Sequence, residues 1–104
     1  MEQIGFRMQL NQGQALEYKR RHDEIWPELV SLLKDAGISD YSIFLHEDSN
    51  SLFAVLKRTP DHRMEQLPLE PVMQCWWKHM SDIMASKDNN EPVVEQLEQV
   101  FYLA

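Results

Sequence analysis

The spacing of apolar side chains changes along the chain, and each change marks an expected element. Between residues 3 and 10 apolar and polar side chains alternate, which is the period-2 pattern of a strand with one buried face. From residue 14 to residue 36 apolar side chains recur three and four positions apart, which predicts helix, ended by Gly37. Because Pro27 has no backbone N–H, this helix should kink or restart at Trp26 and Pro27.

Two more strands and a second helix are expected further along the chain. Residues 41–46 and 52–58 are rich in β-forming side chains and flank a polar connector, which predicts a hairpin. A short helical turn should start at residues 59–61, and a longer helix should run from residue 70 or 71 to Met84. The apolar run at residues 100–103 predicts the last strand.

The order strand, helix, hairpin, helix, strand is typical of an α+β, ferredoxin-like βαββαβ fold, whose first and third strands are central. We expect residues 1–104 to form one such domain. Residues 52–56 are apolar on both faces, whereas helices cover only one face of this kind of sheet. A second copy of the chain would cover the other face, so we expect a homodimer in which two sheets face each other. The long connection at residues 85–97 should cover a site or a partner.

The charge balance narrows the possible partners. Seventeen Asp and Glu residues against ten Lys and Arg residues give a net charge of −7. Proteins that bind nucleic acids or anionic membranes need clustered positive charge, so we expect neither partner. The basic run Lys19–Arg21 is short and has acidic neighbours, which indicates a solvated helix face.

Cysteine and apolar-run counts favour a cytoplasmic protein. Cys75 is the single cysteine, so no intrachain disulfide can form, and we expect a small buried side chain. Glu2 and Arg7 interrupt what would have to be a signal peptide, and no run approaches the roughly 20 apolar residues of a membrane span. The three glycines are too dispersed for a phosphate-binding loop or a dinucleotide fingerprint.

Three ring-bearing side chains share one face of the first expected helix. Tyr18, His22 and Trp26 are spaced four positions apart and therefore follow one another along that face. A histidine with a pKa near neutrality can both give and take a proton. The plainer interpretation is a core histidine that bonds to a backbone carbonyl or to Tyr18, and the residues alone leave both open.

A pair of indoles on the second long helix is the other candidate. Trp76 and Trp77 point about 100° apart, so both can border one cavity without stacking on each other. Indoles suit a neutral sugar, because the ring packs on the apolar C–H face while its N–H reaches a hydroxyl. Packing of the helix on the sheet would use the same side chains.

The remaining polar residues carry weaker signals. Arg7 and Gln9, on the polar face of a central strand, either line a cavity, face solvent or make a dimer contact. The four histidines share no metal-ligand spacing, so we expect no metal site.

Four segments together resemble the L-rhamnose mutarotase family. They cover nearly the whole chain in the family's order: YKRRHDEIWPEL at residues 18–29, DYSIFL at 40–45, QCWWKHMSDIM at 74–84 and LEQVFYLA at 97–104. Cys75, Met64 and Ala104 stand where the family usually has other residues. None of these three is a proposed proton-transfer or stacking group.

The resemblance implies a fold, a reaction and a set of residues. It implies a homodimeric, ferredoxin-like fold of the dimeric α/β-barrel type, and an isomerase that interconverts the α and β anomers of L-rhamnose without a cofactor. Within the family motif His22 corresponds to the proton donor. The substrate-binding aromatic residues fall on Tyr18, Tyr41, Trp76 and Trp77.

Two other functions stay open at the level of sequence. One is another enzyme of the same barrel architecture, such as a cofactor-free monooxygenase, because a fold does not determine a function. The other is a non-catalytic sugar-binding or dimerisation module in which His22 is structural.

Overall fold

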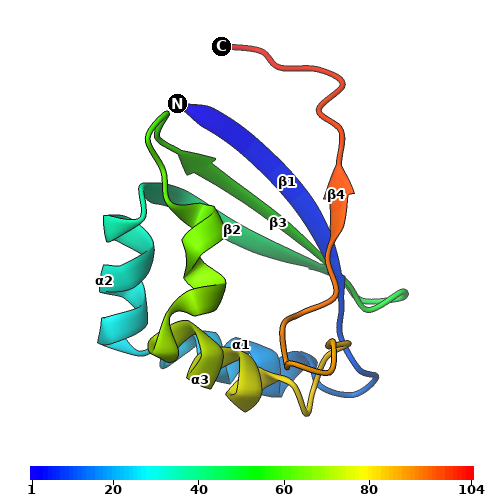
Figure 1. Cartoon of the computed structure of the whole chain (residues 1–104). Helices are drawn as coiled ribbons and strands as arrows, with labels where there is room; N and C mark the ends of the chain where they lie inside the picture. The colour runs from blue at the N-terminus through cyan, green and yellow to red at the C-terminus, as the bar shows by residue number, and fades with distance from the viewer.

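The computed structural model describes all 104 residues as a curved sheet with helices on one side (Figure 1). The longest α-helix has ten residues, and no helix is long and apolar enough to cross a membrane. The elements in chain order are β1 (Glu2–Gln9), α1 (Ala15–Asp23), α2 (Pro27–Asp35), β2 (Ile38–His46), β3 (Ser51–Arg58), the 3₁₀ helix η1 (Met64–Leu69), α3 (Pro71–Met80) and β4 (Glu95–Leu97).

The four strands form one antiparallel sheet in the order β2-β3-β1-β4. The first and third strands are therefore central, and β2 and β3 form the predicted hairpin. Strand β2 begins at Ile38, three residues earlier than predicted. Its register shifts between Ser39 and Ser42, so residues 38–40 do not continue the alternating pattern of residues 41–46. Asp40 in that shift has φ of 48°, so the alternation of buried and exposed positions is interrupted there.

The first helical segment is interrupted near Pro27 as predicted, and it forms two separate helices. Helix α1 ends at Asp23, and α2 begins with Pro27 at its first position, where the missing N–H has no cost. Gly37 follows α2 with φ of +92°, as a glycine after a helix commonly does. The backbone amide of Thr59 donates to the carbonyl of Gly37, so the helix end is held against the end of β3.

The predicted last strand is wrong. Residues 100–103 have no regular structure, and β4 is the shorter segment Glu95–Leu97, which pairs with β1. The side chains of Val100, Phe101, Tyr102 and Leu103 are between 65% and 87% exposed, because no strand of this chain lies beside them. Figure 1 shows this tail continuing past the end of β4 and turning toward the side of the N-terminus. Helix α3 is also shorter than predicted and ends at Met80, although Ile83 and Met84 remain buried.

The core lies between the sheet and the helices. Cys75 is not part of it: its thiol is exposed on α3, which overturns the expected burial. The buried apolar residues come from every helix and from the three longer strands: Phe6, Met8, Leu10, Tyr18, Leu29, Ala36, Ile38, Leu52, Ala54, Leu56, Leu67, Met73, Trp76, Met80, Ile83 and Met84.

The opposite face of the sheet is uncovered and mixed in character. Phe53 and Val55 of β3 are half-buried there, as the apolar pattern on both faces of that strand predicts, and Phe44 of β2 is 63% exposed. A polar network surrounds Arg7, whose guanidinium donates to Ser51 Oγ at 3.0 Å, to Glu95 Oε1 at 2.7 Å and to Gln9 Oε1 at 2.7 Å. This face therefore carries both apolar surface and a fixed arrangement of polar groups.

Replacing Gly37 by alanine should destabilise the fold more than the same change at Gly13. Both glycines have positive φ, which costs an alanine roughly 1–2 kcal/mol. A Cβ at Gly13 would meet nothing within 4 Å, whereas one at Gly37 would lie 2.4 Å from Thr59 Oγ1. Overpacking of this kind costs about 1–3 kcal/mol more. Urea unfolding of Gly37→Ala and Gly13→Ala measures the difference, and equal losses would contradict the assigned close approach.

Candidate active site

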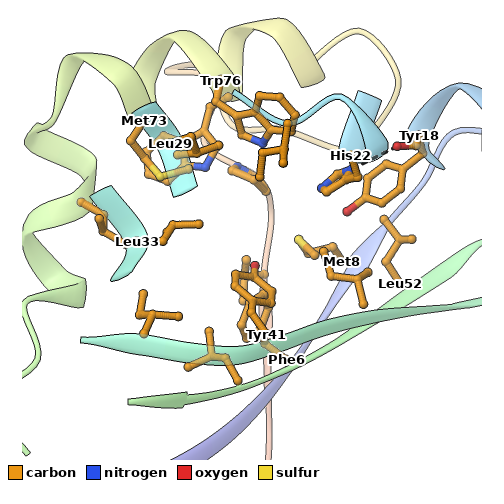
Figure 2. Close-up of a pocket in the computed structure, with 18 of the residues that line it drawn as sticks. Phe6, Met8, Tyr18, His22, Leu29, Leu33, Tyr41, Leu52, Met73 and Trp76 are labelled. Carbon is orange, nitrogen blue, oxygen red and sulfur yellow. Dashed lines mark hydrogen bonds between the residues drawn. The ribbon is translucent and has the colours of Figure 1, made fainter. Parts of the chain in front are cut away.

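A cavity of about 980 Å³ lies between the helices and the face of the sheet that they cover. Figure 2 shows the ring of His22 and the phenol of Tyr18 on one side of it, with Tyr41 and Trp76 on other sides. All five candidate residues line this cavity: Tyr18, His22, Tyr41, Trp76 and Trp77. The long connection also contributes to the wall, through Glu91, Pro92, Val94 and Gln96, as its length predicts.

His22 is held in one orientation by its own helix. Its Nδ1 lies 3.0 Å from the backbone oxygen of Tyr18, one turn earlier in α1. A carbonyl only accepts hydrogen bonds, so Nδ1 carries the proton and donates it. In the neutral ring the other nitrogen, Nε2, is then unprotonated and able to accept a proton.

The surroundings of His22 favour its neutral form. Burial lowers the pKa of the imidazole below its ordinary value of 6.5, while the bond to the Tyr18 carbonyl and the nearby Asp23 carboxylate oppose that shift in part. The ring stacks on Tyr18 with centroids 4.3 Å apart, and it meets Trp76 edge-on at 5.4 Å. At neutral pH the side chain is therefore an uncharged base with fixed position.

The two phenols are neutral hydrogen-bonding groups. Burial raises the pKa of Tyr18 well above 10, and the protein around Tyr41 raises the pKa of that phenol to about 12. Neither phenol oxygen hydrogen-bonds within the chain, and Figure 2 shows both side chains directed into the cavity that they line. The shift in β2 lets Tyr41 and Ile38 both face the helices, although an uninterrupted strand would turn one of them away.

The two indoles differ in burial. Trp76 is only 6% exposed and belongs to the core as well as to the cavity wall, whereas Trp77 is half-buried. Trp26 packs edge-on against Trp76 at 5.2 Å and does not itself line the cavity. His79, which carried no signal in the sequence, stacks on Trp26 with centroids 5.7 Å apart. Trp26 therefore supports the wall from behind.

The basic run of α1 is only partly a solvated face. The side chains of Lys19 and Arg20 are 72% and 57% exposed, as predicted, but that of Arg21 is 10% exposed. Arg21 follows Tyr18 by three positions and therefore lies beside the buried side of the helix. This spacing could have distinguished Arg21 from its two exposed neighbours in the sequence. Its guanidinium donates to Glu17 of α1 and to Asp82 beyond α3, and it lowers the pKa of the Asp82 carboxyl.

Arg7 and Gln9 do not line the cavity. Both side chains point to the uncovered face of the sheet, so that alternative is wrong, and a solvent-facing or dimer-contacting role is left for them. Nowhere in the chain do three or more His, Cys, Asp or Glu side chains gather in a way that could hold a metal ion.

Comparison with known proteins gives matches over the whole chain. A family model described as L-rhamnose mutarotase matches residues 3–103. The L-rhamnose mutarotases of Rhizobium meliloti and Acidiphilium cryptum are 59% and 60% identical over 103 residues, which is 99% of this chain and 99% of each relative. A crystal structure of L-rhamnose mutarotase from Formosa agariphila is 46% identical, covers 100% of both chains and has a TM-score of 0.93. The chain belongs to the L-rhamnose mutarotase family.

Proposed function

We propose that this protein is an isomerase that interconverts the α and β anomers of L-rhamnose without a cofactor. Full-length similarity to relatives that carry the name of this activity supports the reaction. One observation carries the assignment of the site. The imidazole of His22 is fixed and neutral, lies at the wall of the cavity and has a free Nε2.

The proposed reaction needs one group that first accepts and then donates a proton. Nε2 of His22 takes the proton of the anomeric hydroxyl, the bond between C1 and the ring oxygen breaks, and its electrons go to the ring oxygen. The imidazolium then gives the proton to the ring oxygen, which leaves an open-chain aldehyde. After rotation about the C1–C2 bond, the same steps in reverse close the ring on the other face. The anomeric hydroxyl oxygen and the ring oxygen are both bonded to C1, so one positioned imidazole can take a proton from the first and give it to the second. His22 is thus the proton donor as well as the base.

The other cavity residues suit a neutral 6-deoxy sugar. The phenols of Tyr18 and Tyr41 remain protonated and can donate to sugar hydroxyls. The indoles of Trp76 and Trp77 offer flat apolar surface to the C–H groups of the ring and to the C6 methyl group.

We further propose a homodimer of the dimeric α/β-barrel type built from a ferredoxin-like fold. The strand order β2-β3-β1-β4 is consistent with that topology. Phe44, Phe53 and Val55 leave apolar surface on the uncovered face of the sheet, and the tail adds four more exposed apolar side chains. A second copy would bury both, because facing sheets pack their inner side chains against each other.

The proposed setting is the cytoplasm, with no nucleic-acid or membrane partner. The net charge of −7 opposes binding to polyanions, and a neutral sugar requires no countercharge. The single cysteine has an exposed thiol, which suits a reducing compartment.

His22→Ala should abolish the acceleration of anomer exchange and leave the fold intact. A positioned acid–base group contributes about 10²- to 10⁴-fold in rate, so the loss should fall in that range. Exchange between the two anomers of L-rhamnose is measured by saturation-transfer NMR, with circular dichroism as the check on folding. His46→Ala is the matched control, because His46 is exposed, does not line the cavity and bonds only to Ser49. Exchange at the wild-type rate in His22→Ala would refute the assignment, and rhamnose binding without exchange in the wild type would identify a binding module.

The pH profile should have its acid limb below pH 6.5. The neutral imidazole is the active form, and burial lowers the His22 pKa from 6.5, so the neutral form persists to a lower pH than for a free histidine. The decrease of kcat/KM on the acid side should therefore have its midpoint below pH 6.5. The rate with His22→Ala is subtracted at each pH to remove solvent catalysis. A midpoint above 6.5 would contradict the proposed role of burial.

Phe44→Glu should convert the dimer to monomers. A carboxylate buried in an apolar interface loses its solvation, which opposes association. Sedimentation velocity at micromolar concentration measures the change. Leu69→Glu is the matched control, since Leu69 is 77% exposed and lies at the end of η1, away from the uncovered face. A monomeric wild-type protein, or a Phe44→Glu variant that stays dimeric, would count against this interface.

A further inference from the structure

We propose that Arg21 is a positioning residue that fixes the separation between α1, which carries Tyr18 and His22, and α3, which carries Trp76. The inference rests on the proposed function, because it concerns how the two sides of that site are held together. Arg21 itself does not line the cavity.

The guanidinium of Arg21 bonds to both helices. Within α1, Nε donates to Glu17 Oε2 at 2.7 Å. At the end of α3, Nη1 donates to the backbone oxygen of His79, and the two Nη groups reach the carboxylate of Asp82 at 2.8 and 3.4 Å. No other side chain of α1 hydrogen-bonds to α3 or to the turn that follows it. Arg21 is therefore the one polar connection between these two helices.

The bonds at the α3 end have favourable electrostatics. The last carbonyls of a helix have no partner within the helix, and the negative end of its dipole attracts a cation. The carbonyl of His79 belongs to this group, since α3 ends at Met80. Asp82 adds a full negative charge beside it, and the planar guanidinium bonds to the carbonyl and the carboxylate together. With a side chain only 10% exposed, Arg21 is also little screened by solvent.

Both attachments lie close to the proposed reacting groups. Arg21 precedes His22 directly, and His79 follows Trp76 by three residues, which is less than one helical turn. The rings of His22 and Trp76 are in edge-on contact at 5.4 Å across this junction. A shift of one helix against the other would therefore move the proton-transfer group relative to the indole wall.

Arg20 provides an internal comparison on the same helix. It also forms ion pairs, with Glu17 and Glu24, but both partners lie within or directly after α1. Its side chain is 57% exposed, and it forms no hydrogen bond or ion pair with α3. Arg20 and Arg21 thus share residue type, helix and one carboxylate partner, and differ in whether they connect to α3.

The test compares Arg21→Lys with Arg20→Lys. Lysine keeps the charge and cannot bond to Glu17, the carbonyl and Asp82 in the fork geometry of arginine. Since a displacement of about 1 Å costs up to about 100-fold in rate, we expect kcat for anomer exchange to fall about tenfold in Arg21→Lys, with KM changing less than about threefold. Arg20→Lys should stay within about twofold of wild type in both constants.

A second measurement reports on the helices without the reaction. The nuclear Overhauser effect between the His22 ring protons and the Trp76 indole protons is recorded in the sugar-free protein at a temperature well below each variant's Tm. It should weaken in Arg21→Lys and stay unchanged in Arg20→Lys. A purely stabilising role of Arg21 would lower Tm and leave both this signal and kcat at wild-type values, which would overturn the proposal.

Asp82→Asn approaches the same connection from the other helix. It keeps the shape of the side chain, removes its charge, and should lower kcat in the same direction as Arg21→Lys. Combined with Arg21→Lys the two losses should be less than additive, because both remove one interaction; fully additive losses would overturn the proposal. Failure of the proposed function is separate, since it would show as exchange retained in His22→Ala, whereas the Overhauser signal tests Arg21 in either case.

Discussion

The structure depends on one constraint: the helices cover only one face of the sheet. The covered face carries the core and, where helices and sheet do not close on each other, the cavity with His22. The uncovered face carries both the exposed Phe44 and the polar network of Arg7. Site and candidate interface are thus separated by the thickness of one sheet, and β1 and β3 contribute side chains to both.

Most of the fold follows from local patterns, and the exceptions have physical causes. Alternating residues, the proline at the helix restart and the glycine after α2 each act within a few positions, so the strands, the restart and Gly37 are predictable. Residues 100–103 look like a strand by the same criterion. A strand also requires a neighbour, and in this chain the edge of β1 pairs only with Glu95–Leu97. Pairing is a property of the three-dimensional fold, which residue patterns do not contain.

The candidate site was predictable where it depends on helix phase and on family resemblance. Tyr18 and His22 follow one another on one face of α1, and Trp76 lies on the adjoining face of α3. The sheet face of Arg7 and the burial of Arg21 depend on contacts between residues distant in the sequence. The choice of face for Arg7 was ambiguous, because a central strand has two. The burial of Arg21 depends on the His79 carbonyl and Asp82, which are distant in the sequence, so the basic run by itself does not distinguish it from its exposed neighbours.

The protonation states of the cavity wall have a consequence for how the site responds to its medium. The imidazole of His22, the phenols of Tyr18 and Tyr41 and the two indoles are all uncharged near neutral pH. Dissolved salt weakens attraction between charges and has little effect on hydrogen bonds between neutral groups or on apolar contact. The contacts of an uncharged sugar with these five side chains therefore depend little on ionic strength, whereas the charged side chains that also line the cavity, such as Asp23 and Glu91, respond to it.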